Sequence, residues 1–463
     1  MDRPAAHQDH RQHHAVVVGA SMAGLLAARV LADRFDHVTV LDRDPLDAGT
    51  TPRRGAPQGR HAHALLAAGA RTMIELFPGI TDELTRAGAA LLDFNQGHWF
   101  QAGGYRAASL IERKVISASR PFLEAHIRRR LGEIPNVRIE GEASVEGLQE
   151  CDGRVRGVRV IDASSYRTIL ADLVVDCSGR SSLGTRWLEE LGYPAPEVSE
   201  VRCDVRYATM TLRRTDTDLD GTFAIVIESP PHGKYAAFLV PIEGDRWIAT
   251  IASSFGAPAP VDEQSFRSVA ARLPSPELDQ VLQRAEVLTP VALHRFISSK
   301  RRRYERLHQH PAGFVALGDA ICSFNPIYGQ GMSSAALQAM ELGAVLDTVG
   351  NGTTLPAAFY RRAAKVIANP WQIAVGADFA YPECTGPKPP GTDLVNRYMA
   401  RVLLAAQVSP EVNTAMILVQ NLLAPPSTLF RPGMVRTVRR AARQAERAMT
   451  HAAVPERRVA QPA

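Results

Sequence analysis

The segment HAVVVGASMAGLLAARVL at residues 14–31, followed by HVTVLD at residues 37–42, predicts a strand, a tight glycine turn, a helix and a second strand. Gly19 permits a sharp exit from the first strand, and Gly24 lets the helix pack close to it. The free N–H groups at the start of such a helix can bind a diphosphate. This order of elements is therefore typical of a dinucleotide-binding unit.

The glycine pattern departs from the usual one at its middle position, where Ser21 stands in place of glycine. A serine is small enough for the backbone to approach a phosphate. Asp42 ends the second strand, where a carboxylate can accept hydrogen bonds from both ribose hydroxyls of an adenosine. We expect the loop and the end of the second strand to contact the dinucleotide, through Gly19, Ala20, Ser21, Met22, Ala23, Gly24, Asp42 and Arg43.

Composition narrows the class of protein. The 463 residues are 45% hydrophobic and 22% charged, which suits a large folded core of two or three units. Five cysteines stand singly, without a C-x-x-C pair, and favour a reducing cytoplasm over a disulfide framework or a zinc site. The net charge of +5 lies largely in short clusters such as 300–303, which is typical of a solvated surface and predicts no nucleic-acid partner.

Changes in pattern along the chain predict an α/β fold, in which a Rossmann-like dinucleotide-binding domain holds an inserted antiparallel-sheet substrate domain and is followed by C-terminal helices. Long alternating strands over 197–254 indicate the insertion, and the apolar strand 313–319 returns to the first domain. A helix is expected over 61–77 and another over 121–131. The expected division is a flexible tail at 1–13, the binding domain at 14–90, 113–196 and 296–385, substrate-domain segments at 91–112 and 197–295, and C-terminal helices and tail at 386–463.

Three separated segments resemble the flavoprotein monooxygenases of the para-hydroxybenzoate hydroxylase fold. They are GASMAG at 19–24 with Asp42, DLVVDCSGR at 172–180, and GDA at 318–320 with NPIYGQGM at 325–332. They cover residues 14–350 in the order and spacing of that family. The resemblance implies that FAD is the cofactor and that the loop Gly19–Gly24 holds its diphosphate.

The same resemblance implies roles for residues outside the first loop. Gly318 and Asp319 would lie against the ribityl chain of FAD, with the carboxylate of Asp319 holding a sugar hydroxyl. The turn after Pro326 would begin a helix whose positive end faces the flavin pyrimidine, and Gly329, Gly331 and Met332 belong to that contact. Arg120, in the pattern SRPFLE at 119–124, would reach the cofactor, and Val145 would contact adenine through its backbone.

The segment RRGAPQGRHAH at 53–63 narrows the resemblance to a bacterial subgroup similar to squalene epoxidase, which includes polyether epoxidases of lasalocid and monensin biosynthesis. Such an enzyme would use O2 through a C4a-hydroperoxyflavin to insert one oxygen atom. Its substrate would be a lipophilic polyketide or terpenoid of secondary metabolism. Electrons would come from NADPH or NADH, directly or through a partner flavin reductase. Ser178 stands where the family has an aspartate associated with the nicotinamide donor, and this departure weakens the expectation of direct use.

Other interpretations stay open at this point. An aromatic hydroxylase is the nearest alternative, and a prenyl-reductase-like FAD oxidoreductase shares the fold without oxygen insertion. A halogenase is disfavoured because Trp99, Trp187, Trp247 and Trp371 stand alone, outside a Trp-x-Trp-x-Ile-Pro signature. The basic helix over 434–449 is expected to be solvated, with peripheral membrane contact the less favoured reading.

Side chains for catalysis or metal binding are not evident in the sequence. Epoxidation by a reduced flavin needs no obligatory base, and Tyr105, Tyr207, Tyr235 and Cys322 are favoured as packing residues. His61 and His63 are two apart and would point to different faces of a helix, which favours packing near the flavin over a metal site. Arg53 and Arg54 would either meet a phosphate or lie in solvent. We therefore predict no catalytic residue and no metal.

Overall fold

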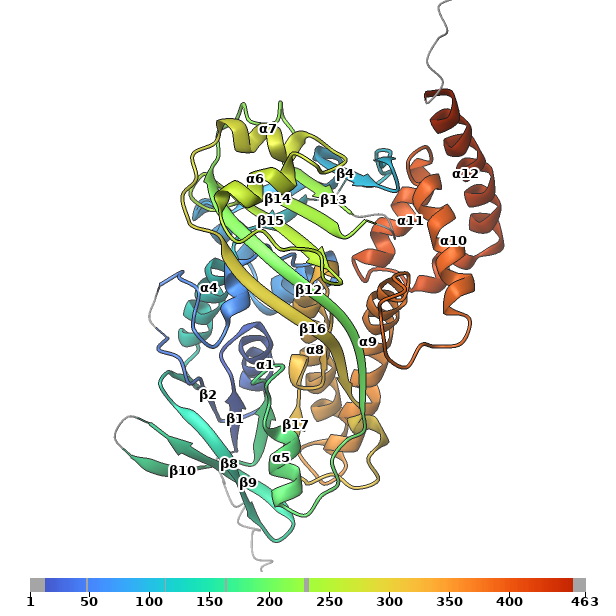
Figure 1. Ribbon diagram of the computed structural model, residues 1–463. Coiled ribbons are helices and arrows are strands. Elements are labelled where there is room, and N and C mark those ends of the chain that lie inside the picture. Colours follow the sequence, from blue (N-terminus) through green and yellow to red (C-terminus); the bar gives the residue numbers. More distant parts are fainter. Residues whose placement is uncertain (1–12, 47–48, 113, 163–164, 229–232, 453–463) are drawn as a thin grey trace, which may run out of the picture.

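A computed structural model describes residues 13–452 except 47–48, 113, 163–164 and 229–232, so residues 1–12 of the expected tail lie outside it. A five-stranded parallel sheet in the order β17-β11-β1-β2-β7 forms the first domain (Figure 1). Its strands are β1 (His14–Val18), β2 (His37–Leu41), β7 (Val137–Glu140), β11 (Leu173–Asp176) and β17 (Phe314–Ala316). The central strands are runs of buried aliphatic residues because a parallel sheet is covered on both faces.

Helices and a small sheet complete this domain. Helix α1 packs against α8, α8 against α2 and α9, and α1 against α4, while β9 of a three-stranded sheet contacts β11. The helices are α1 (Met22–Ala32), α2 (Ala67–Leu76), α3 (Ile80–Arg86), α4 (Arg120–Gly132), α5 (Gly184–Glu190), α8 (Gly331–Val349) and α9 (Leu355–Asp378). The small sheet consists of β8 (Ser144–Cys151), β9 (Arg154–Ile161) and β10 (Tyr166–Leu170).

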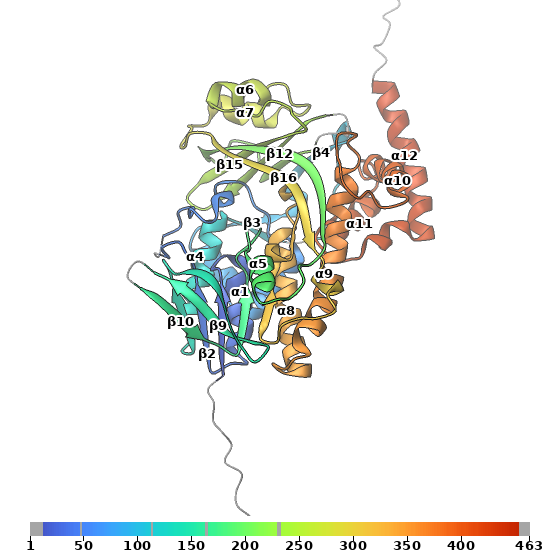
Figure 2. The ribbon, with the colours of Figure 1, turned by 60° about the horizontal axis from the view of Figure 1, so that its bottom comes forward.

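The second domain is an eight-stranded sheet in the order β18-β16-β12-β15-β14-β13-β4-β5. Its strands are β4 (Gly97–Gln101), β5 (Gly104–Tyr105), β12 (Val198–Arg213), β13 (Ala224–Ile227), β14 (Tyr235–Ile242), β15 (Arg246–Ser254), β16 (Ala292–Arg302) and β18 (Cys322–Ser323). Helices α6 (Glu263–Ala270) and α7 (Glu277–Arg284) cover the face that is turned away from the first domain (Figure 2). The other face is therefore left to meet the first domain.

Two smaller parts flank the large sheet. A ribbon of β3 (Ala90–Asp93) and β6 (Lys114–Ser117) forms a separate two-stranded sheet. The C-terminal helices α10 (Thr392–Ala405), α11 (Pro410–Gln420) and α12 (Pro432–Ala452) share their own hydrophobic cluster, on the right of Figure 1. Within the described residues, no helix is both long and apolar enough to cross a membrane.

The α/β fold, with its two large sheets and its C-terminal helices, confirms the predicted fold class. Helix α4 is the one expected at 121–131, but the helix expected over 61–77 begins only at Ala67. Residues 61–66 are held out of it because His61 and Ala62 bond to side chains of the large sheet. The expected domain boundary between 295 and 296 falls inside β16, whose pairing with β12 continues across it.

Candidate active site

The glycine loop between β1 and α1 has no room for side chains at two positions. Gly19 has φ +105°, and a Cβ there would lie 2.6 Å from the carbonyl oxygen of Cys177. A Cβ on Gly24 would lie 1.8 Å from the carbonyl oxygen of Gly19. Both glycines are therefore required for the loop to pass between β11 and the first turn of α1.

Asp42, at the end of β2, holds this loop from the side. Its carboxylate accepts hydrogen bonds from the backbone N–H of Ala20 at 2.7 Å and of Asp44 at 2.9 Å. It also forms an ion pair of 3.0 Å with Arg53. Asp42 also lines the large cavity described below. The contact with a ribose that we expect of this residue stays a prediction.

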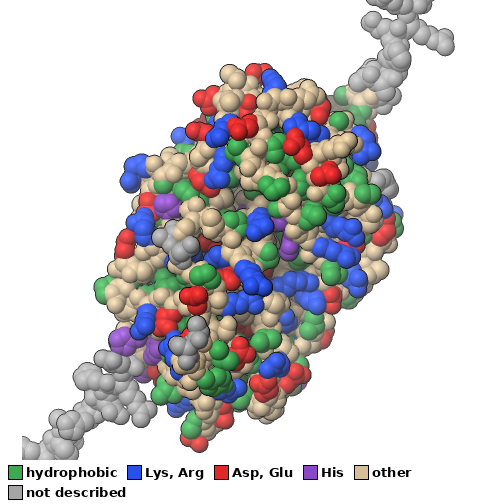
Figure 3. Space-filling view, turned by 60° about the vertical axis from the view of Figure 1, so that its left-hand side comes forward, with side chains coloured by type: hydrophobic (Ala, Val, Ile, Leu, Met, Phe, Trp, Pro, Cys, Tyr) green, Lys and Arg blue, Asp and Glu red, His purple; other side chains and the backbone are tan. Residues whose placement is uncertain are grey.

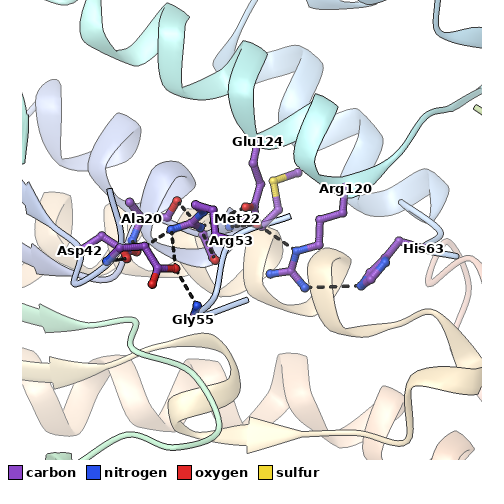
Figure 4. A network of polar contacts seen from close by, with 10 residues as sticks. Ala20, Met22, Asp42, Arg53, Gly55, His63, Arg120 and Glu124 are labelled. Carbon is purple, nitrogen blue, oxygen red and sulfur yellow. Dashed lines mark hydrogen bonds and ion pairs between the residues drawn. The ribbon is translucent and has the colours of Figure 1, made fainter. Parts of the chain in front are cut away.

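Arg53 and Glu124 form the centre of a buried ionic network, drawn in Figure 4. Arg53 pairs with Asp42 and with Glu124 at 3.1 Å, and also donates to the Ser21 hydroxyl. Glu124, only 3% exposed, accepts from Met22 N at 3.1 Å and from Arg120 Nε at 2.9 Å. Burial acts to raise the pKa of Glu124, but Arg120 and Arg53 outweigh it and lower that pKa. The glycine loop, α4 and the loop after β2 are thus held together by charge.

This network contains residues that the sequence did not assign. Arg53 lies in a loop rich in arginine and glycine, and the spacing of these residues does not predict which arginine is buried and which is exposed to solvent. Glu124 follows Arg120 by four residues on α4, a spacing that allows an ion pair but does not indicate a third partner. Arg120 itself also approaches His63, with 3.5 Å between Nη1 and Nε2.

A second group of residues lies where β17 ends and α8 begins. Gly318 has φ +69°, and a Cβ on it would lie 2.9 Å from Cβ of Ala23, so β17 and the glycine loop approach closely here. Burial raises the pKa of the Asp319 carboxyl, while Arg120, Arg180 and Arg302 act to lower it. Gln330, the residue before α8, is 2% exposed, and its Oε1 has no hydrogen-bond partner among the described residues. Buried polar atoms without a partner are uncommon, and Gln330 lines the cavity described below, so its Oε1 is available to a ligand there.

Both groups open onto one cavity of about 970 Å³. It runs from the glycine loop to the large sheet and to the end of α11, since its lining includes Ser21, Thr250 and Gln420. Most predicted site residues line it: Gly19, Ser21, Met22, Ala23, Asp42, Arg43, Arg120, Val145, Asp319, Pro326, Gly329, Gly331 and Met332. Ala20, Gly24 and Gly318 do not line the cavity. Gly24 and Gly318 lie where the chain packs too closely for a side chain, and the backbone N–H of Ala20 donates to Asp42.

A model of the family described as FAD binding domain matches residues 12–366. The chain belongs to this family. Protein Rv3254 of Mycobacterium tuberculosis is similar, with 33% identity over 389 residues that cover 80% of this chain and 81% of that protein. The family match over residues 12–366 includes the glycine loop, Asp319 and the start of α8, the three parts that meet at the cavity.

Solved structures with the same fold are much more distant in sequence. A flavoprotein/dehydrogenase from Cytophaga hutchinsonii superposes with a TM-score of 0.68 at 14% identity, covering 95% of this chain and 100% of its own. The flavin-dependent brominase Bmp2 gives 0.65 at 15% identity, covering 94% and 100%. The p-nitrophenol 4-monooxygenase PnpA of Pseudomonas putida gives 0.62 at 16% identity, covering 89% and 98%. At these identities the likeness shows the fold alone.

The residues present fit FAD. The glycine loop and the N-terminus of α1 suit its diphosphate, and Asp319 lies on the wall between that loop and α8. The free N–H groups at the start of α8 and the unpartnered Oε1 of Gln330 suit the polar edge of a flavin ring. FAD is thus the cofactor that the family and the cavity both support.

The part of the cavity beyond this cradle contains polar residues that the sequence did not bring together. His61, Tyr207 and His294 lie on its wall, whereas Tyr105, Tyr235 and Cys322 do not line it. Ser178 is exposed on this wall, and its hydroxyl and its N–H donate to the carboxylate of Asp176, which is fully buried. Among the described residues, no group of three or more His, Cys, Asp or Glu is arranged to hold a metal ion.

Proposed function

We propose that this protein is an FAD-dependent monooxygenase that inserts one oxygen atom from O2 into a lipophilic small molecule, with epoxidation of a polyketide or terpenoid alkene as the preferred reaction. The observation that carries the proposal is the continuity of one cavity from the FAD cradle to an apolar wall. That wall consists of side chains from β3, β6, β13 and β14, namely Leu92, Val115, Ile116, Val226, Phe238 and Val240.

The bound flavin, once reduced, supplies the activation of O2. The chain supplies the enclosure. The β3–β6 ribbon and the large sheet give the cavity an apolar stretch of wall at the positions named above, which suits a lipophilic substrate. The first turn of α8 lines the cavity with its positive end, which would stabilise negative charge on a bound, reduced flavin.

The source of electrons is part of the same proposal. We expect NADPH or NADH to serve, either at this chain or through a partner flavin reductase. Arg43, Arg54 and Arg180 line the cavity, and Lys and Arg side chains gather across the middle of the face in Figure 3, which suits an anionic dinucleotide. Anaerobic mixing of the FAD-loaded protein with each nicotinamide distinguishes the routes, because direct use bleaches the flavin absorbance without a second protein.

Oxygen incorporation tests the reaction itself. The reduced holoenzyme is supplied with ¹⁸O2 and either a lipophilic polyene or an electron-rich phenol, and products are analysed by mass. An epoxidase labels the polyene by one oxygen atom, and an aromatic hydroxylase labels the phenol. A saturated or desaturated product without label would contradict the monooxygenase proposal and support a prenyl-reductase-like oxidoreductase.

A further inference from the structure

Three polar rings meet on the wall of the substrate cavity. Tyr207 on β12 and His294 on β16 are directly opposite each other in the antiparallel register, so both side chains project from the same face of the sheet. His61 comes from the loop before α2, and its ring centre lies 6.0 Å from that of Tyr207 and 5.6 Å from that of His294. All three line the cavity. We call them the polar ring cluster.

The cluster is held in place from behind. His61 Nδ1 shares a hydrogen bond of 2.8 Å with Thr209 Oγ1, which shares one of 2.7 Å with Thr250 Oγ1. Both threonines are at most 2% exposed, so the imidazole is fixed from the core side. Tyr207 donates its hydroxyl proton to Asn325 Oδ1 at 3.2 Å, and the backbone of Ile327 also hydrogen-bonds to this hydroxyl, so the Tyr207 ring is fixed to the turn before α8.

Polar capacity remains on the cavity side. Among the described residues, no hydrogen bond joins His61 Nε2 or either ring nitrogen of His294 to another group. A neutral imidazole offers one donor and one acceptor nitrogen. The cluster can therefore complement an oxygen that both donates and accepts.

The cluster carries no charge at physiological pH. Burial, then the neighbouring His294, His63 and Arg60, lower the pKa of His61 to about 3. Burial and Arg180 likewise lower the pKa of His294. The rings can therefore form hydrogen bonds with a ligand, but they carry no positive charge that would favour an anion.

We propose that His61, Tyr207 and His294 form a subsite that binds an uncharged oxygen, a hydroxyl or carbonyl group, of the lipophilic substrate. The inference rests on the proposed function in that it takes this cavity to be the place of the substrate. The polar ring cluster would set the position of the substrate along the cavity. If the oxygen of the substrate lay against the apolar part of the wall instead, it would lose its hydrogen bonds, which costs free energy. The cluster then determines which carbon of the substrate lies at the flavin.

Small fluorinated rings test the subsite without knowledge of the substrate. Binding of 4-fluorophenol, 4-fluorotoluene and 4-fluorobenzoate to the FAD-loaded protein near pH 7 is measured by ¹⁹F NMR titration. We expect 4-fluorophenol to bind about fivefold more tightly than 4-fluorotoluene, which corresponds to about 1 kcal/mol for one net hydrogen bond. The anionic 4-fluorobenzoate should bind no better than 4-fluorotoluene.

Variants assign the preference to the cluster. His61→Phe and His294→Phe keep an aromatic ring and remove its nitrogens, so each should weaken 4-fluorophenol binding toward that of 4-fluorotoluene and leave 4-fluorotoluene unchanged. His308→Phe is the matched control, since His308 is exposed and does not line the cavity. FAD content and melting temperature of each variant show that the fold is retained.

Three results would overturn the subsite: equal binding of 4-fluorophenol and 4-fluorotoluene, a preference for 4-fluorobenzoate, or a phenol preference that survives both variants. None of these depends on turnover. A failure of ¹⁸O incorporation would contradict the monooxygenase proposal while the fragment preference stands, so the two failures are distinguishable.

Discussion

At the scale of single residues, Asp378 is a buried carboxyl next to the site. This carboxyl at the end of α9 is 2% exposed and accepts hydrogen bonds from Asn325 Nδ2 at 2.8 Å and the Tyr328 hydroxyl at 2.9 Å. Its Oδ2 has no hydrogen-bond partner among the described residues. Burial raises its pKa to about 7, although the hydrogen bonds from Asn325 and Tyr328 act to lower it. Asp378 is therefore neutral over much of the acidic range in the folded protein.

A raised carboxyl pKa makes the folded state lose stability as pH rises. Between about pH 4 and pH 7 the folded protein keeps a proton that the unfolded chain has released, so Asp378 lowers the unfolding free energy progressively, by at most about 4 kcal/mol, and no further above pH 7. Asp378→Asn should remove this pH dependence. The unfolding free energy of the variant, relative to that of the wild type, should therefore be higher at pH 8 than at pH 5. Urea unfolding at both values measures it. The same difference between the two proteins at both pH values would contradict the assignment.

Asp319 is the residue on which the expected contact with the ribityl chain depends. Asp319→Ala should weaken FAD binding by about tenfold or more, roughly 1.4 kcal/mol, because a buried sugar hydroxyl would lose a charged acceptor. The flavin absorbance of the purified protein, relative to its protein absorbance, measures the loss. Asp347→Ala is a suitable control, since Asp347 lies on α8 and pairs at the surface with Arg34. Full flavin content in Asp319→Ala would count against the assignment.

At the scale of elements, the close packing of α1 against the loop before it determines whether the diphosphate cradle exists. Gly24→Ala places a Cβ against the backbone oxygen of Gly19, where only a shift of the helix relieves the contact. We expect a loss of several kcal/mol, on the order of an overpacked core substitution, together with loss of FAD. Thermal unfolding and flavin absorbance measure the two effects.

Gly376→Ala is the matched substitution in a helix without such a contact. Gly376 lies in α9, and a Cβ there would have no atom within 4 Å. Alanine should stabilise the protein by about 0.5 to 1 kcal/mol through its higher helix propensity. Equal behaviour of the two variants would mean that the contact at Gly24 relaxes easily.

At the scale of the whole molecule, the cavity lies between the two sheets and the C-terminal helices, so its contents bridge parts that are far apart in the chain. FAD binds the folded state, and removing it should lower the unfolding free energy by about 2.7 kcal/mol relative to protein with free FAD at one hundred times its Kd. Calorimetry of the apoprotein and of the FAD-saturated protein measures this. An unchanged melting temperature would contradict the binding of FAD to the folded protein.

The sequence by itself determined the parts whose chemistry is local. The turn after β1 requires glycine at 19 because its φ is positive, and at 24 because a Cβ would meet the carbonyl oxygen of Gly19 five residues earlier, so this local pattern predicts both the fold and a dinucleotide. The strand expected at 313–319 likewise follows from a short apolar run, and β17 lies within it. The family match over residues 12–366 agrees with these features.

Only the tertiary structure decided which distant side chains meet. His61, Tyr207 and His294 are brought together by the register of β12 with β16 and by a loop that leaves the expected helix, and Arg53 reaches Glu124 across 71 residues. Burial beside Asn325 raises the pKa of Asp378, and the residues next to Asp378 in the sequence do not predict this burial. Periodicity records which face of an element is apolar. Pairing of polar groups across elements depends on strand register and helix packing, which the whole fold sets.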